Sequence, residues 1–383
     1  MRVTRGRIMR GFMTALLAAG AASADPPRLL AVQQAEPARP SIEQRLARVA
    51  ADVFAGSDHV DADIAELKAI LAADPRSAQA HMLLGLAYRT KGSSDLMGEA
   101  AGELRQAIDL DPSLIPARLY LAHLYLDLGR PERAREELQA ALTRVPGQPQ
   151  LQALLAECER QLGKPDTALD LTAQALKNDP SFAEARYYQG LALYDLKRRD
   201  EAIEAFEQVL QAGGKRAEVY ASLGNAYLEA GRFDAAIKNL TDGVYLEPSR
   251  ADLLIQLARA YRLKGQLTQA ATWLSRAGTL VPATAVSAAD QQTQRDLSFE
   301  DGLVRLKQNQ LEAAARSLKK AVDVDPGYGP GYRYLAEVYL RQGLYSRALD
   351  QATRAEKLGS PLPDDLQKTL QDKIRASRPK GQA

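Results

Sequence analysis

The side chains best suited to metal binding or catalysis are few in this sequence. Its three histidines, His59, His81 and His123, stand far apart, and none belongs to an i, i+4 pair. Zinc sites need several converging His or Cys ligands, and no Cys-x-x-Cys or His-Glu-x-x-His motif is present. Cys158 is the only cysteine, so it can form no disulfide within the chain and is expected to be a small buried residue. We therefore predict no metal and no cofactor.

Phosphate-binding and acid–base chemistry find no better support. The stretch Gly213-Gly214-Lys215 lacks the upstream glycine and the following Ser or Thr of a phosphate loop. Carboxylate pairs such as Glu136 and Glu137 lie on predicted helix faces, where nothing would perturb them. The sequence therefore predicts a protein that is not an enzyme. Its formal net charge of +2, with both signs interspersed, argues against a nucleic-acid partner.

Prolines mark a regular period in the middle of the chain. They recur on a grid of 34 residues, with Gly214 at the one grid point that lacks a proline: Pro112, Pro146, Pro180, Pro248 and Pro282. A fixed period of this length indicates one supersecondary unit stacked on copies of itself. The period predicts function only as a class, because a stack of repeats offers a binding surface without identifying the partner.

One period, residues 115–148, predicts two amphipathic helices joined by a tight turn. Apolar residues three or four apart mark the two faces: Leu121, Ala122 and Tyr125, then Ala134, Leu138 and Ala141. Between these faces Gly129 suits the left-handed conformation that ends a helix, and Pro131 suits the first turn of the next helix. Pro146 cannot continue the second helix, so the unit ends there.

The other units repeat this pattern with few exceptions. The first helix carries a small residue where two helix axes must come close, opposite an alanine of the second helix: Gly85, Ala122, Ala156, Gly190, Gly224, Ala258, Gly302 and Ala336. A tyrosine follows three places later in most units, but Glu159, Leu193 and Arg305 break that pattern. Asn309 and Lys197 each replace the turn glycine once, and Lys197 marks the weakest turn. Because one unit cannot bury these faces alone, stability must come from neighbouring units.

This pattern resembles the tetratricopeptide repeat family over roughly residues 44 to 360, and it rests on several matching positions in each of eight units. The resemblance implies an all-α fold, an α-solenoid in which antiparallel helical hairpins form a right-handed superhelix. About eight units are expected, with a degenerate N-terminal hairpin and a C-terminal capping helix. The resemblance also implies a concave groove lined mainly by the first helices, and a protein or peptide partner.

The chain divides into segments by composition and spacing. Residues 1–24 are expected to be a secretory signal peptide, because arginines precede a short apolar run and the small residues Ala22-Ser23-Ala24. The remaining segments are expected to be a Pro- and Ala-rich tether at 25–40, a degenerate hairpin at 41–77, repeats 1–6 at 78–282, an inserted loop or helix extension within 283–294, repeats 7–8 at 295–360, a capping helix at 361–377 and a disordered tail at 378–383. Ser41 and Gln44 suit a capping box at the start of the hairpin. After cleavage past Ala24 no membrane span is expected, and the protein is predicted to be exported, in the style of a bacterial periplasmic protein.

Six residues are candidates for contact with the partner, because the repeat pattern places them on the groove side of first helices: His123, Tyr187, Tyr194, Asn225, Arg259 and Arg262. Tyrosine and arginine are favoured anchors at protein interfaces, and arginine binds carboxylates well. The set predicts an extended peptide or an acidic segment as ligand, and an ordinary helix surface is the alternative interpretation. The carboxylate clamp of some tetratricopeptide proteins is not carried over, because Ala221 and Gln256 stand where its Lys and second Asn are expected.

Three functions are compatible with these observations. The first is a non-enzymatic interaction scaffold that binds a partner segment in its groove, in bacterial cell-envelope assembly or secretion. The second is a structural protein that assembles with copies of itself through its end caps or its convex faces. The third is an accessory subunit of a glycosyltransferase or polysaccharide export system. The sequence identifies neither the partner nor its chemical class, peptide or glycan.

Overall fold

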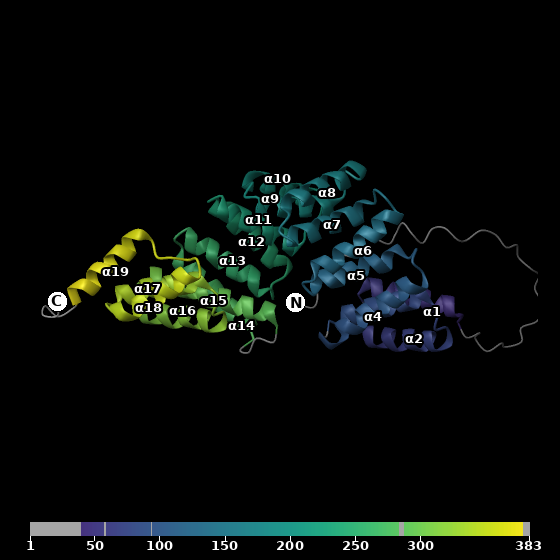
Figure 1. Cartoon of the computed structure of the whole chain (residues 1–383), viewed down its shortest axis with the longest axis horizontal. Coiled ribbons are helices and arrows are strands. Elements are labelled where there is room, and N and C mark those ends of the chain that lie inside the picture. Colours follow the sequence, from purple (N-terminus) through teal and green to yellow (C-terminus); the bar gives the residue numbers. More distant parts are fainter. Residues whose placement is uncertain (1–39, 57–58, 93, 283–286, 378–383) are drawn as a thin grey trace, which may run out of the picture. The chain divides into compact units, whose positions relative to one another are not determined.

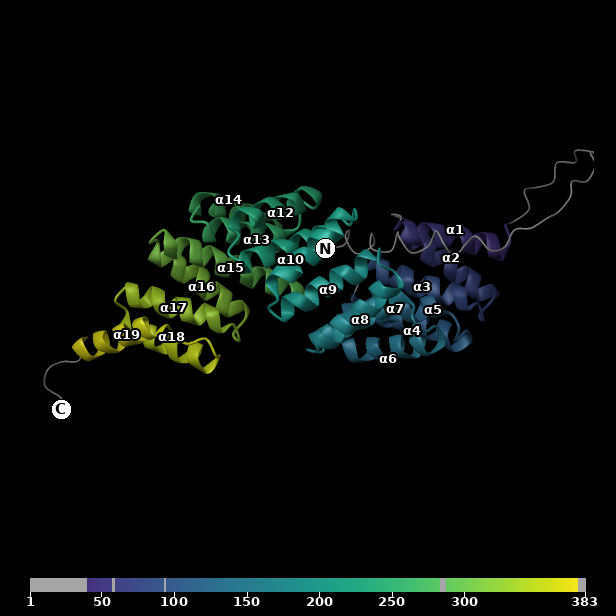
Figure 2. The same ribbon diagram turned by 90° about the horizontal axis from the view of Figure 1, so that it is seen from above.

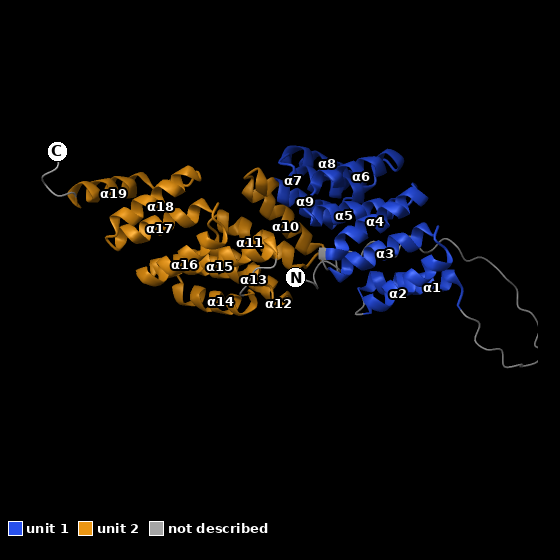
Figure 3. Ribbon diagram, turned by 60° about the horizontal axis from the view of Figure 1, so that its bottom comes forward, with its two compact units in different colours: residues 1–192 blue, residues 193–383 orange. Residues whose placement is uncertain are grey.

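The computed structural model describes residues 40–56, 59–92, 94–282 and 287–377, and in those ranges all regular secondary structure is helical. The chain forms two compact units, residues 1–192 and 193–383, which are described separately here (Figure 3). The predicted signal peptide, nearly all of the predicted tether and the predicted tail lie outside the described residues.

The described residues form nineteen helices joined by turns (Figure 1). The first nine are α1 (Ile42–Ala55), α2 (Val60–Ala73), α3 (Ala78–Lys91), α4 (Ser94–Leu110), α5 (Ile115–Asp127), α6 (Pro131–Arg144), α7 (Pro149–Gln161), α8 (Pro165–Asn178) and α9 (Ala183–Asp195), which reaches the second unit. The others are α10 (Arg199–Gln211), α11 (Ala217–Glu229), α12 (Phe233–Leu246), α13 (Ala251–Leu263), α14 (Leu267–Leu280), α15 (Ala288–Lys307), α16 (Leu311–Val324), α17 (Gly329–Arg341), α18 (Tyr345–Lys357) and α19 (Asp364–Ser377).

From α1 to α8 and from α10 to α19, each helix packs against the next, as α15 does with α16 and α16 with α17 in the second unit (Figure 2). The turn inside each pair is set by one residue in the left-handed conformation. Gly129 has φ 64°, and the N–H of Arg130 closes the helix end by donating to the carbonyl of Tyr125 at 2.8 Å. Lys197 and Asn309, the two predicted replacements of the turn glycine, are the described non-glycine residues with positive φ, at 62° and 59°. The all-α repeat architecture expected from the sequence is therefore confirmed.

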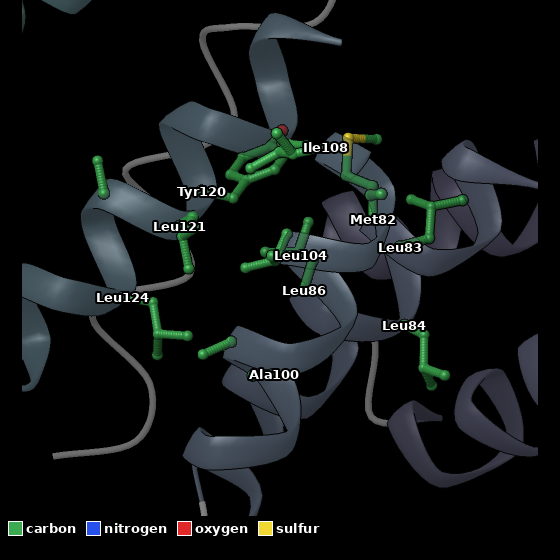
Figure 4. Close-up of a cluster of buried hydrophobic side chains, with 14 of the residues drawn as sticks. Met82, Leu83, Leu84, Leu86, Ala100, Leu104, Ile108, Tyr120, Leu121 and Leu124 are labelled. Atoms are coloured by element: carbon green, nitrogen blue, oxygen red, sulfur yellow. The ribbon is translucent and has the colours of Figure 1, made fainter. Parts of the chain in front are cut away.

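Small residues allow the two helices of a pair to approach closely. A Cβ atom added to Gly224 would lie 2.5 Å from Cγ of Leu240, and one added to Gly85 would lie 2.7 Å from Cγ of Leu104. Only glycine permits these contacts, since real Cβ atoms do not come so close. Around Leu104 the first unit buries a continuous apolar core, including Leu83, Leu121 and Leu124 (Figure 4). In this core the apolar face of one helix pair is thus covered by the next pair, as the stacking of repeats requires.

A capping box and a terminal helix mark the two ends of the described repeat array. Ser41 caps α1 with the expected capping box, in which its hydroxyl accepts from the N–H of Gln44 and the Gln44 side chain accepts from the N–H of Ser41. At the other end α19 covers the last pair, and Leu370 is buried with Leu362 and Leu340. In a stack of repeats, such a helix hides an apolar face that would otherwise meet solvent.

The ten-residue departure from the period lengthens a helix. Residues 288–294, predicted within the inserted loop or helix extension, form the first turns of the 20-residue α15, and 283–286 lie outside the described residues. Ser287 and Asp290 form a capping box that starts α15 early, with the Ser287 hydroxyl 3.1 Å from the N–H of Asp290. Over the described part, the insertion is therefore helix rather than loop.

Across the part of the chain that the structure describes, none of the helices has the length and apolarity needed to cross a membrane.

Candidate functional site

The six residues expected to contact a partner divide between the two units, and each unit is considered by itself. His123 on α5 and Tyr187 on α9 belong to the first unit; Tyr194, Asn225, Arg259 and Arg262 belong to the second, on α9, α11 and α13.

In the first unit His123 lies beside an ion pair. Arg89 of α3 donates to Oδ2 of Asp127 at the end of α5, with 2.8 Å between Nη2 and the oxygen. Burial, together with the Arg89 charge, lowers the pKa of His123 to about 3. The ring is therefore neutral at physiological pH and offers hydrogen bonds rather than charge. Tyr187 is half-buried and packs against Tyr188, with 5.8 Å between ring centroids.

In the second unit Tyr194 links consecutive first helices. Its hydroxyl donates to Oε1 of Glu229 at the end of α11, and Nε of Arg199 lies 3.2 Å from the other carboxylate oxygen. Burial and the neighbouring carboxylate raise the pKa of Tyr194, so it remains a neutral donor. The Lys197 ammonium lies 5.6 Å from the Tyr194 ring centroid. Asn225 is half-buried on α11.

Arg262 is held inside the second unit by a carboxylate that the sequence reasoning missed. Arg262 and Glu300 are 8% and 6% exposed, and two hydrogen bonds of 2.7 and 3.3 Å join the guanidinium of α13 to the carboxylate of α15. Such a bidentate pair fixes both side chains. The structure thus places Arg262 as a support for the surface, whereas the sequence had suggested an exposed anchor.

Arg259, one turn earlier on α13, is a solvent-exposed arginine of the same surface. Its side chain is 48% exposed, and its nearest carboxylate, Glu300, lies 3.9 Å away and is already bonded to Arg262. The Arg259 charge also acts on Tyr194, Asp296 and Tyr328, where it opposes the rise in pKa that burial causes. The Arg259 guanidinium is therefore accessible to solvent, and its closest carboxylate is one that Arg262 already binds.

Helix α15 supplies an aromatic and charged border to this arginine. Arg295 lies 4.7 Å above the Tyr328 ring and pairs with Asp325 at 2.9 Å. Phe299 meets the edge of Tyr328 at 5.0 Å between centroids, and burial raises the pKa of Tyr328 to about 12. The predicted set did not include these residues, because it took no residue from the seventh repeat. We call the whole set the α13–α15 face: Arg259, Arg262, Arg295, Asp296, Phe299, Glu300 and Tyr328.

The α13–α15 face is suited to binding an anion by charge and stacking. It presents an exposed guanidinium beside aromatic rings, which are the side chains enriched at the energetic centres of protein interfaces. Across residues 40–377, apart from the gaps given above, no group of three or more His, Cys, Asp or Glu could hold a metal ion.

Comparisons with known proteins indicate the family to which the chain is similar. Two family models, both described as tetratricopeptide repeat, match the chain: one at residues 49–115, 159–217, 222–283 and 299–363, the other at 97–158 and 193–243. The first alone covers more than half of the sequence. No curated protein matches the chain.

Solved structures share the fold at low sequence identity. The crystal structure of the APC/C hetero-tetramer Cut9–Hcn1 aligns with a TM-score of 0.64 and 15% identity, covering 87% of this chain and 63% of that chain. A tetratricopeptide repeat protein from Parabacteroides merdae ATCC 43184 aligns with a TM-score of 0.51 and 19% identity, covering 69% of this chain and 99% of that chain. At these identities the likeness concerns the fold alone.

Proposed function

This chain belongs to the tetratricopeptide repeat family, whose domains bind protein partners, and on that premise we propose that it is a non-enzymatic scaffold for an acidic partner segment. The segment lies along the first helices of the second unit, and its carboxylates meet Arg259 on the α13–α15 face. Tyr194 and Asn225 extend the contact surface along α9 and α11.

The observation that carries this proposal is the contrast between two arginines one turn apart. Arg262 is buried and neutralised by Glu300, while Arg259 is 48% exposed and has only a 3.9 Å contact with the same carboxylate. Because the buried Arg262–Glu300 pair already holds the surface beside Arg259 in place, the protein loses less conformational entropy when a partner binds. Arginine also binds carboxylates with two parallel hydrogen bonds, so an acidic segment is the best match.

A random peptide library displayed on phage, selected against the full chain, tests the proposal. We expect enriched peptides to contain Asp or Glu next to an aromatic residue. Affinity of a synthetic enriched peptide, measured by fluorescence anisotropy, should fall at least tenfold in Arg259→Glu, as is usual for a central arginine anchor. The control is Lys238→Glu, which makes the same charge reversal at an exposed position of α12.

Two results would contradict the proposal. One is enrichment of peptides without acidic residues. The other is an equal affinity of the peptide for the Arg259→Glu and Lys238→Glu variants, which would mean that binding depends on overall charge or occurs elsewhere.

We also propose that the scaffold works outside the cytoplasm, in bacterial envelope assembly or secretion. The support is the arrangement of arginines, apolar run and Ala22-Ser23-Ala24 in the first 24 residues. Osmotic-shock fractionation of a bacterial host followed by N-terminal sequencing should recover a chain that begins at Asp25. Recovery only in the cytosol, with the first 24 residues retained, would overturn this location.

A further inference from the structure

The second unit contains a pocket whose lining includes none of the residues of the α13–α15 face. It is formed between α14, α15 and α16 and has a volume of ≈ 550 Å³. Leu274, Leu297 and Val304 give it apolar walls, while Asp301, Arg305 and Lys320 supply charged groups. This volume lies within the ~300–1,000 Å³ of ordinary small-molecule sites.

The pocket lies where the seventh repeat departs from most other repeats, at two positions of α15 that are apolar or aromatic in most of them. Position 301 corresponds to Leu121, Leu223 and Leu257, and position 305 corresponds to Tyr125, Tyr227 and Tyr261. Those residues are all buried or half-buried between helices of their own and adjoining units. Substitution of Asp and Arg for Leu and Tyr removes apolar volume from the junction.

The two replacing side chains are organised by hydrogen bonds. Nε of Arg305 donates to Oδ2 of Asp301 at 2.6 Å, and the Ser317 hydroxyl donates to the same oxygen at 2.5 Å. Both remain partly open, since the side chains of Asp301 and Arg305 are 27% and 39% exposed. Arg305 thereby neutralises the one carboxylate of the lining without being enclosed.

The remaining charge of the lining is positive. Lys320 lines the pocket from α16, is exposed, and takes part in no ion pair with the described residues. One uncompensated cation above apolar walls matches a ligand that has one negative charge and an apolar body. We propose that this pocket binds a small monoanionic amphiphile, with Lys320 and the open side of Arg305 receiving the anionic group.

Titration calorimetry of the full chain with decanoate, below its micelle concentration, tests the proposal. Decanol and decylamine serve as probes of the same chain length with no charge and with the opposite charge. We expect one saturable site for decanoate and weaker binding of both other probes. Lys320→Glu should weaken decanoate about tenfold by replacing attraction with repulsion, whereas Lys319→Glu, an exposed neighbour that does not line the pocket, should change affinity less than twofold.

A second variant tests the pocket by filling it. Asp301→Leu combined with Arg305→Tyr introduces the side chains that most other repeats have at these positions, and it should abolish decanoate binding while raising the midpoint of thermal unfolding. If this double variant does not fold, the comparison of Lys320→Glu with Lys319→Glu decides. The proposal is overturned if decanoate does not bind, if decylamine binds equally well, or if Lys320→Glu leaves the affinity unchanged.

Discussion

Loss of Glu300 should destabilise the second unit far more than loss of an exposed carboxylate. In Glu300→Ala the Arg262 guanidinium, 8% exposed, would keep its charge and lose two hydrogen bonds of 2.7 and 3.3 Å. Breaking a buried pair from one side costs about 3–5 kcal/mol, because an uncompensated charge stays inside. Glu300→Gln keeps the shape and one acceptor oxygen, so we expect a smaller cost, about 1–3 kcal/mol.

The chain contains a local reporter for this experiment. Its one tryptophan, Trp273, lies on α14, which packs against both α13 and α15. Urea unfolding followed by tryptophan fluorescence therefore measures the stability of this part of the stack. With a slope of about 2 kcal/mol per M of urea, the midpoint should fall by roughly 2 M in Glu300→Ala.

Glu337→Ala is the matched control on the neighbouring first helix α17. Glu337 pairs with Arg341 at 2.6 Å, but the Arg341 side chain is 49% exposed and can be hydrated when its partner is lost. Exposed pairs contribute about 0.2–1 kcal/mol, so the midpoint should shift by less than about 0.5 M. Equal shifts for Glu300→Ala and Glu337→Ala would refute the reasoning that burial makes Arg262 dependent on Glu300.

Two further predictions concern close packing and protonation. Gly224→Ala should lower the free energy of unfolding by about 1–3 kcal/mol, since its Cβ would lie 2.5 Å from Cγ of Leu240. In Gly278→Ala the nearest neighbouring atom lies 3.9 Å from the new Cβ, so this variant should gain up to about 1 kcal/mol from helix propensity. Thermal unfolding midpoints that shift in the same direction for both variants would contradict this reasoning. The His123 ring should show no NMR titration from pH 8 to pH 4, because its folded pKa is about 3. Since the unfolded ring takes up a proton near pH 6.5 and the folded ring does not, His123 should reduce stability as pH falls from about 6.5 toward 3, and His123→Gln should flatten that slope.

The local geometry of the repeats could be predicted from the sequence because it depends on short-range chemistry. A residue that replaces the turn glycine must adopt positive φ to close the helix end, and Lys197 and Asn309 both do so. The close approach of Gly224 to Leu240 follows from the same pattern. These features need only the residue type and its place within one period.

The candidate site was less predictable because it depends on how successive units face each other. Arg262 and Glu300 are 38 positions apart, and their contact spans the ten-residue departure from the period. The repeat alignment fixes which side of α13 bears Arg262, but it does not say which residue of the lengthened α15 will oppose it. For the same reason the pocket beside Asp301 was not foreseen, although the sequence shows that Arg305 of the same helix breaks the tyrosine pattern.

Helix α15 carries residues that differ from those at the same repeat positions in other first helices. They distinguish the contact between the sixth and seventh repeats from the other contacts between repeats. The residue that corresponds to Glu300 in α13 is Gln256, an uncharged amide with a buried Oε1 atom that accepts no hydrogen bond from the described residues. A ligand that recognised only the repeated residues would bind every junction alike, so selectivity requires residues that break the repeat. Glu300, which supports the surface around Arg259, is one such residue, and Asp301 and Arg305, which form the pocket, are others. Because all three lie on α15, substitutions in this helix should change binding more than equivalent substitutions in α11.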